Sequence, residues 1–239
     1  MSSIQGQVIL VTGAAKRIGR EIALRLAREG ARVCIHYSTS EEQARATAEE
    51  CGGAPVFRAD LTRVSEIERM FVEVDQKIGR MDGLVNNAGR FSTIDPLKVT
   101  EADWDFIHSV NLKATFFCCQ QAARRMIAGD GGKIVNISSL GGLRPWSCNA
   151  HYNASKAGVI MMTRALAKAF APKVTVNSVA PGVIPFGPVD AHTERLIART
   201  PAGRAGTGAE VADAVAYFLS SSNFITGQIL AVDGGLSQK

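Results

Sequence analysis

The sequence has few of the features that mark membrane, secreted or metal-dependent proteins. No apolar stretch approaches the ~18 residues that a membrane span needs, and the short polar start from Met1 to Gln7 is unlike a secretory signal. The cysteines are odd in number, irregularly spaced and without a CxxC pair, which argues against a disulfide framework and a zinc site. They are Cys34, Cys51, Cys118, Cys119 and Cys148. We therefore expect a cytoplasmic protein with no bound metal and no membrane association.

Charge is not concentrated in any segment either. The formal net charge is +5, and the densest basic cluster is the pair Arg124 and Arg125. This is too little for a basic stripe along a nucleic acid, so we expect no nucleic-acid partner. The basic excess is compatible with an anionic cofactor and equally compatible with no binding role.

Strand and helix patterns alternate from one end of the chain to the other. The predicted strands are Val8–Val11, Arg32–Ile35, Pro55–Ala59, Leu84–Val85, Lys133–Ile137, Val174–Val179 and Ile229–Val232. The predicted helices are Ile18–Leu26, Glu41–Glu50, Ile67–Ile78, Trp104–Met126, Tyr152–Phe170 and Glu210–Leu219. Strands separated by helices require crossovers, which give a parallel sheet with helices on both faces.

We therefore predict the α/β class, with one Rossmann-type, doubly wound domain over residues 1–239 and about seven strands. The irregular stretch from Pro181 to Gly208 is rich in proline and glycine. We interpret it as a loop with a little helix that covers the substrate.

A glycine-bearing turn, Thr12–Gly19, joins the first strand to the first helix. Such a turn presents backbone N–H groups and a helix N-terminus to a phosphate. Gly13 permits the tight turn and Gly19 permits close packing of helix on sheet. The flanking strand and helix that a dinucleotide site requires are both present.

Two features of the sequence favour NADP(H) over NAD(H). Arg17 stands where the middle glycine is usual, and a cation there suits a 2′-phosphate. An NAD-binding protein would place an acid after the second strand to hold the ribose 2′-hydroxyl, but this chain has the run from His36 to Ser40. An imidazole and hydroxyls can donate hydrogen bonds to a phosphate, whereas a carboxylate would repel it.

Tyr152 and Lys156 lie four residues apart and so share one face of a helix. A phenol with an ordinary pKa is a poor acid or base at neutral pH. A neighbouring ammonium stabilises the phenolate and lowers that pKa, so the pair indicates proton-transfer chemistry.

Taken together, these motifs resemble a classical short-chain dehydrogenase/reductase over essentially the whole chain. The matching segments, in the order of the family, are Thr12–Gly19, Asp60-Leu61, Asn86-Asn87-Ala88-Gly89, Asn111, Ser138-Ser139, Tyr152-x-x-x-Lys156, Pro181-Gly182 and Asp233-Gly234-Gly235. The resemblance implies an oxidoreductase that transfers hydride from a nicotinamide cofactor to a C=O or C=N carbon.

The resemblance also implies a role for each catalytic residue. Ser139, thirteen residues before Tyr152, would bind the substrate oxygen, and Tyr152 would donate the proton in reduction. Lys156 would hold the nicotinamide ribose and lower the pKa of Tyr152, and Asn111 would anchor a proton-relaying water.

Cofactor contacts follow from the same resemblance. Asp60 would accept from the adenine amino group, Asn87–Gly89 would line the adenosine ribose, and Val183 would contact the nicotinamide amide. The expected contacts are Gly13, Arg17, Ile18, Gly19, His36, Tyr37, Ser38, Asp60, Leu61, Asn87, Ala88, Gly89, Tyr152, Lys156, Pro181, Gly182 and Val183. Family members usually form tetramers through the two long helices and the C-terminal segment, so a homotetramer is expected.

Three functions remain open at the level of the sequence. A carbonyl reductase acting on a ketone or 3-oxoacyl substrate is favoured by Ser139, although Asp130 lies where a basic residue would meet an acidic carrier. A pteridine reductase is favoured by Arg17 and the pair His36-Tyr37, but such enzymes carry aspartate in place of Ser139. A regulator that binds NADP(H) without turnover would not need the catalytic set. Trp146 and Phe186 are open between a pocket role and a packing role.

Overall fold

The computed structural model describes residues 3–238, so the first two residues of the polar start lie outside it. Seven parallel strands form one sheet in the order β3-β2-β1-β4-β5-β6-β7. The strands are β1 (Val8–Val11), β2 (Arg32–Tyr37), β3 (Val56–Arg58), β4 (Gly83–Asn86), β5 (Gly132–Ile137), β6 (Val174–Pro181) and β7 (Ile229–Val232). The prediction of a Rossmann-type α/β fold with about seven strands is confirmed.

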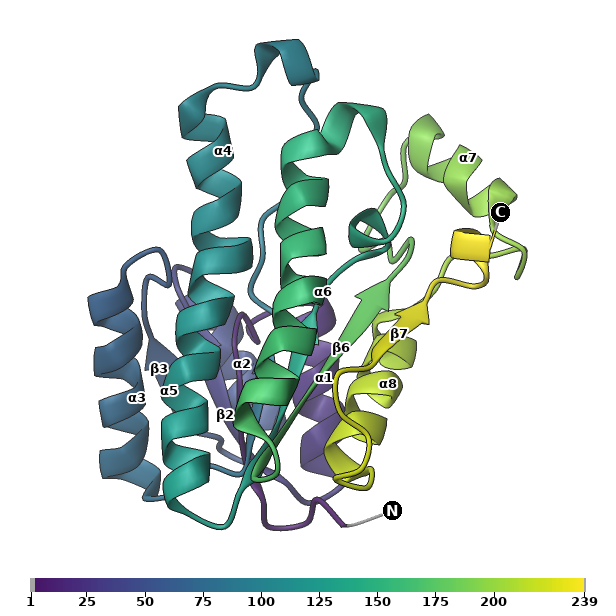
Figure 1. Ribbon diagram of the computed structural model, residues 1–239. Coiled ribbons are helices and arrows are strands. Elements are labelled where there is room, and N and C mark those ends of the chain that lie inside the picture. Colours follow the sequence, from purple (N-terminus) through teal and green to yellow (C-terminus); the bar gives the residue numbers. More distant parts are fainter. Residues whose placement is uncertain (1–2, 239) are drawn as a thin grey trace.

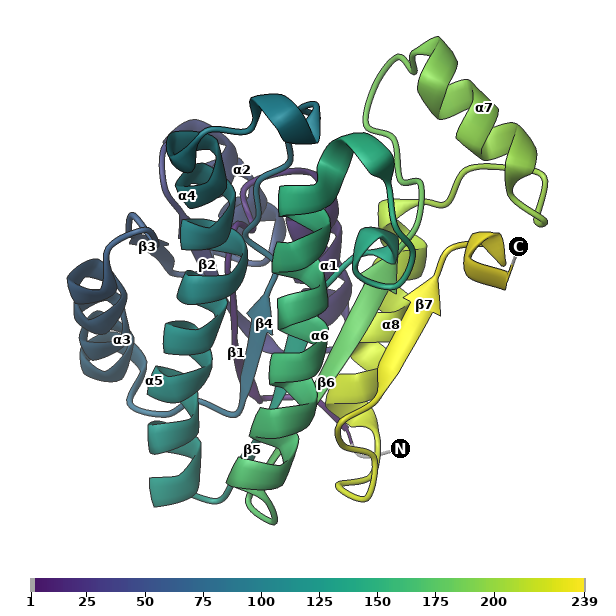
Figure 2. The same ribbon diagram turned by 45° about the horizontal axis from the view of Figure 1, so that its top comes forward.

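Helices cover both faces of the sheet (Figures 1 and 2). One face carries α1 (Arg17–Arg28), α2 (Glu41–Glu50) and α8 (Gly208–Ser220). The other carries α3 (Val64–Ile78), α5 (Thr115–Ala128) and α6 (Ala150–Phe170). Strand β1 explains the arrangement, because Ile9 and Val11 belong to one core and Val8 and Leu10 to the other. A central parallel strand is buried on both faces and therefore shows no polar alternation.

The predicted helix from Trp104 to Met126 is interrupted in the structure. A helix α4 (Glu101–His108) passes into a π-helical stretch at Ser109–Ala114, which then continues as α5. The hydroxyl of Thr115 donates to the carbonyl of Asn111 at 2.8 Å within this widened turn. Single π-turns inside helices often mark functional positions, and this one carries Asn111.

The chain between β6 and α8 is irregular, as predicted, but shorter than the sequence indicated. Pro181 still belongs to β6 and Gly208 already belongs to α8. A helix α7 (Ala191–Arg199) with no buried residue stands out from the edge of the sheet (Figure 2). Within residues 3–238, no helix combines the length and apolar character that crossing a membrane requires.

Candidate active site

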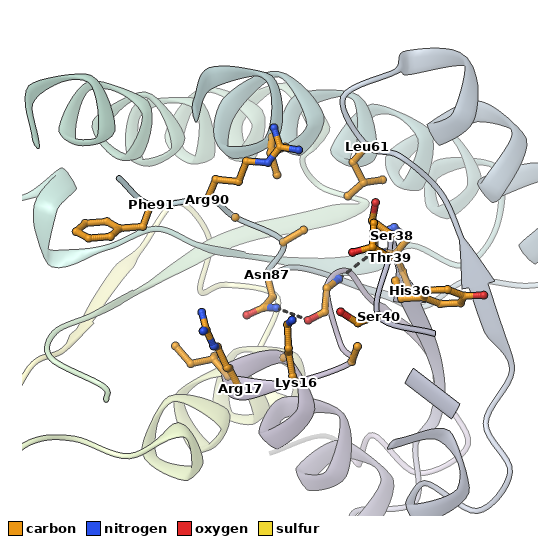
Figure 3. A pocket seen from close by; sticks show the side chains of 18 of the residues that line it. Lys16, Arg17, His36, Ser38, Thr39, Ser40, Leu61, Asn87, Arg90 and Phe91 are labelled. Carbon is orange, nitrogen blue, oxygen red and sulfur yellow. Dashed lines mark hydrogen bonds between the residues drawn. The ribbon is translucent and has the colours of Figure 1, made fainter. Parts of the chain in front are cut away.

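A cavity of about 600 Å³ opens at the carboxyl ends of β1, β2 and β4 (Figure 3). The strand order reverses between β1 and β4, and open α/β sheets bind their ligands at such a reversal. The lining residues are Gly13, Ala15, Lys16, Arg17, Ile18, Gly19, His36, Tyr37, Ser38, Thr39, Ser40, Asp60, Leu61, Asn87, Ala88, Gly89, Arg90, Phe91, Val110, Tyr152, Ile184 and Phe186. Most of the predicted cofactor contacts thus share one cavity.

Hydrogen bonds from the segment after β4 fix the glycine turn. The Thr12 hydroxyl accepts from the N–H groups of Asn87 and Ala88 at 3.0 and 3.1 Å. The Asn87 side chain in turn donates to the carbonyls of Thr12 and Gly13, both at 3.0 Å. Two motifs that are 75 residues apart in sequence therefore form one rigid wall of the cavity.

Glycine is required at both predicted positions of the turn. Gly13 has a left-handed φ of 63°, which side chains other than glycine rarely adopt. A Cβ on Gly19 would lie 2.2 Å from the Gly13 carbonyl oxygen and 2.4 Å from the Asn87 side-chain nitrogen. Because no side chain fits at Gly19, the first turn of α1 packs directly against the strand-end turn. Ile18 and Gly19 line the cavity, and N–H groups in the first turn of a helix have no partner within the helix.

Lys16 and Arg17 bring positive charge to the start of α1. Both are exposed and line the cavity. In Figure 3 both side chains rise into it, Lys16 on the side of Ser40 and Arg17 on the side of Phe91. Arg17 has φ 55° and is the one residue other than glycine with positive φ among residues 3–238. An arginine held in the left-handed region costs of order 1 kcal/mol, a strain often found at functional sites.

His36 does not have the role that the sequence suggested. Its Nδ1 accepts from the Gly13 N–H at 3.0 Å, and its Nε2 lies 3.1 Å from the Ala59 carbonyl oxygen. Burial lowers the pKa of His36 to about 4, so the ring is neutral with its proton on Nε2. Both ring nitrogens are engaged within the protein, so the imidazole supports the glycine turn and has no hydrogen left for a phosphate.

Tyr152 lines the cavity, and Ser139 is buried next to it. Ser139 follows β5 and its oxygen accepts from the Gly141 N–H at 3.0 Å. Burial raises the pKa of the Tyr152 phenol, and the nearby Ser139 hydroxyl opposes this with a smaller lowering effect. The predicted decrease in the pKa of Tyr152 is therefore not found in this structure, because desolvation of the buried ring dominates.

Lys156 and Asn111 lie beside this pair. The Lys156 ammonium is buried and donates to the Ile137 carbonyl at 2.9 Å, and burial lowers its pKa to about 8. The Asn111 side chain bridges to the Arg90 backbone at 2.7 and 2.9 Å. A Cβ on Gly89 would lie 3.3 Å from Asn111 Oδ1 and 3.5 Å from Lys156 Nζ, so the two side chains converge on this exposed glycine.

Aromatic rings flank the Tyr152 phenol. The Phe91 ring meets it edge-on with centroids 4.8 Å apart, and the Trp146 ring is nearly parallel to it at 6.2 Å. The sequence left Trp146 undecided and did not single out Phe91. Its only signal was its position two residues after Gly89, in the segment that follows β4.

The segment that carries Phe91 is attached to the start of α6. Asn149 donates to the Ser92 carbonyl at 2.9 Å and to the Thr93 hydroxyl at 3.0 Å. The His151 Nε2 lies 2.7 Å from the Ser92 hydroxyl oxygen, so this histidine takes part in the attachment. Because Tyr152 directly follows His151, these contacts hold Phe91 against the Tyr152 ring.

The segment after β6 only partly matches the prediction. Ile184 and Phe186 line the cavity, whereas Pro181, Gly182 and Val183 are not among the described residues that do so. The carbonyl of Val183 accepts from the Gly206 N–H at 3.0 Å. Ser139, Lys156 and Asn111 are likewise buried behind the cavity wall.

The fold and this site define an oxidoreductase of the dinucleotide-binding α/β class. A family model described as enoyl-(acyl carrier protein) reductase matches residues 13–237. A 3-oxoacyl-[acyl-carrier-protein] reductase of Staphylococcus aureus is 38% identical over 95% of this chain and 96% of its own. A short-chain type dehydrogenase/reductase of Picea abies is 36% identical over 96% of this chain and 92% of its own. The chain belongs to the short-chain dehydrogenase/reductase family.

A solved structure supports the same conclusion. A gluconate 5-dehydrogenase from Burkholderia cenocepacia, in complex with NADP and tartrate, superimposes with a TM-score of 0.93 at 32% identity, covering 100% of this chain and 98% of that one. The similarity extends over the sheet, both helical layers and the segment between β6 and α8, because the whole chain is covered.

Proposed function

We propose that the protein is an NADPH-dependent reductase that transfers hydride to the carbonyl carbon of a ketone or 3-oxoacyl substrate, with Tyr152 as the proton donor. The observation that carries the proposal is that the buried phenol of Tyr152 lines the cavity built by the glycine turn, next to the Ser139 hydroxyl and one helical turn from Lys156. A phenol, a hydroxyl and an ammonium converge where a carbonyl oxygen must gain a proton.

The residues divide the work as follows. Bound NADPH supplies the hydride. Ser139 donates a hydrogen bond to the substrate oxygen and orients the carbonyl, while Tyr152 gives that oxygen its proton. Lys156, with N–H groups left beyond its bond to Ile137, holds the nicotinamide ribose and stabilises the phenolate that Tyr152 becomes. Asn111 converges with Lys156 on Gly89 and would anchor the water through which Tyr152 regains a proton after each reduction.

The residues around the cavity fit a dinucleotide. The glycine turn offers N–H groups and a helix N-terminus to the pyrophosphate. Asp60 lines the cavity at the adenine end, where its Oδ1 already accepts from the Thr62 hydroxyl at 2.8 Å and the Thr62 N–H at 3.0 Å. The chain places no acid between Tyr37 and Ser40, which supports NADPH over NADH.

A ketone or 3-oxoacyl substrate agrees with the serine at position 139 and with the names of the relatives. Reduction of a C=N bond in a pterin is the second candidate, because Phe91 and Trp146 give Tyr152 two aromatic neighbours beside which a flat ring could stack. NADP(H) binding without turnover is the remote alternative. A pure sensor has no need of the buried Ser139, Tyr152 and Lys156 side chains.

The test is a screen for NADPH oxidation by the purified protein with ketones, 3-oxoacyl thioesters, quinones and dihydropterins. We expect turnover with a ketone or 3-oxoacyl thioester that Tyr152→Phe abolishes. Tyr217→Phe, which alters an exposed tyrosine on α8, is the matched control and should leave the rate unchanged. Turnover with dihydropterins alone would select the second candidate. Tight NADPH binding without turnover of any substrate class would favour the sensor.

A further inference from the structure

A second hollow, lined by three arginines, adjoins the adenosine end of the main cavity. It has a volume of about 540 Å³ and shares Ser38, Thr39 and Asp60 with the main cavity. Its remaining lining residues are Arg58, Arg63, Glu66 and Arg69. Three guanidinium groups thus gather beside the end of β2, where a dinucleotide's ribose 2′ position lies in folds of this type.

The sheet register places Arg58 next to this end of β2. Arg58 is the last residue of β3 and pairs with Tyr37, directly before Ser38. Its neighbour Phe57 is fully buried, whereas Arg58 is exposed. The Arg58 carbonyl accepts from the Arg69 guanidinium at 2.6 Å, which fixes the strand end.

The three arginines differ in how their charges are compensated. Arg63 lies 3.8 Å from both Asp60 and Glu66. Arg69 pairs with Glu73 at 3.3 Å and lies 3.9 Å from Glu66. For Arg58, no carboxylate oxygen among residues 3–238 lies within 4.0 Å of its guanidinium. The nearby carboxylate of Glu41, whose pKa Arg58 helps to lower, is already held by Arg45 at 2.7 Å.

The other candidate groups are less suitable for a 2′-phosphate. The imidazole of His36 has both nitrogens occupied by Gly13 and Ala59. The side chain of Arg17 rises on the Phe91 side of the cavity, away from Ser38 and Thr39 (Figure 3). Lys16 stands nearer to Ser40 and offers a phosphate a point charge, but an ammonium lacks the two parallel N–H groups that bind a phosphate in bidentate fashion.

We propose that Arg58, at the end of β3, is the residue that selects NADP(H), binding the 2′-phosphate together with the hydroxyls of Ser38 and Thr39. The inference rests on the proposed use of NADPH. It assigns the preference for NADPH over NADH to a residue of β3, outside the glycine turn. The guanidinium donates to the phosphate oxygens, and the two hydroxyls complete the site from β2.

The test measures binding of nucleotide fragments, independent of catalysis. The affinities of 2′,5′-ADP and 5′-AMP are determined by calorimetry for the parent, Arg58→Ala, Arg58→Lys, Arg17→Ala and Arg32→Ala. Arg32 is an exposed arginine at the opposite end of β2, so its variant controls for the loss of one charge. Unchanged affinity for 5′-AMP shows that each variant is folded.

We expect Arg58→Ala to weaken 2′,5′-ADP binding by roughly tenfold to a hundredfold, the value of one charge-assisted contact. Binding of 5′-AMP should not change, and Arg58→Lys should recover part of the loss. Arg17→Ala and Arg32→Ala should preserve the ratio of the two affinities. If Arg17→Ala, but not Arg58→Ala, abolished the preference for 2′,5′-ADP over 5′-AMP, the inference would be wrong, while the proposed use of NADPH would stand. A parent that binds both fragments equally would overturn the use of NADPH and, with it, the inference.

Discussion

The neutral, buried state of His36 makes the protein sensitive to acid. Burial lowers the pKa of this imidazole to about 4 in the folded chain, whereas an exposed histidine in the unfolded chain titrates near ~6.5. Below pH ~6.5 the unfolded state therefore binds a proton that the folded state excludes, and stability falls as the pH is lowered. The loss is complete only when the pH reaches the folded-state pKa of about 4.

Those two pKa values set the size of the effect. Between pH 7 and pH 5, His36 alone should lower the free energy of unfolding by about 2 kcal/mol. Its charged form would also lose the hydrogen bond that the Gly13 N–H donates to Nδ1, because a protonated Nδ1 cannot accept. Acid should therefore loosen the glycine turn before it unfolds the rest of the sheet.

Urea unfolding at several pH values tests this, with His36→Asn as the comparison. The amide oxygen of asparagine can accept from Gly13 but does not titrate. Other groups, such as Glu210 with its pKa lowered to about 2 by Arg204, affect parent and variant alike and cancel in the difference. We expect the variant to be the less stable at pH 7 and to lose about 2 kcal/mol less than the parent on going to pH 5. Parallel stability curves for the two proteins would refute the reasoning.

Three further predictions follow from the site and the surface. Gly19→Ala should destabilise the fold by on the order of 2 kcal/mol and abolish NADPH binding, because its Cβ would meet the Gly13 carbonyl; thermal melts and fluorescence titration check both effects. The rate of reduction should fall above pH 8, where Lys156 loses its proton, and Lys156→Arg should flatten that limb of the pH–rate profile; the same break in both proteins would contradict the role of Lys156. Because α4 and α6 expose Trp104, Phe106 and Met161, we expect a homotetramer, which light scattering measures. A stable monomer at micromolar concentration would contradict this expectation.

The fold was predictable because its signals are local and repeated. Buried parallel strands give short apolar runs such as Val8–Val11, and glycines such as Gly30 end the helices between them. The interruption at Ser109–Ala114 was not predictable, since an apolar pattern of helical spacing continues through a π-turn. Helix α3 also begins at Val64, three residues before the predicted start at Ile67, because the apolar pattern marks the buried face of a helix and not its first residue.

The sequence indicated which residues form the candidate site, but not the contacts that each of them makes. Tyr152, Ser139 and the glycine turn carry their spacing in the sequence, so their convergence could be anticipated. The engagement of His36 depends on Gly13 and Ala59, and the position of Phe91 depends on contacts with the start of α6. Such partners are distant in sequence, so only the folded chain brings them together.

The role of Tyr152 as proton donor is tested most directly by measuring NADPH affinity and turnover together in Tyr152→Phe. The substitution keeps the ring that packs against Phe91 but removes the hydroxyl that Ser139 contacts. NADPH binding should survive, while turnover of a substrate that the parent reduces well should fall by roughly two to four decades. Ser139→Ala in the same background should add little, because residues of one catalytic unit are not additive. Near-parental turnover by Tyr152→Phe would contradict the assignment, because the proton would then have to come from another group.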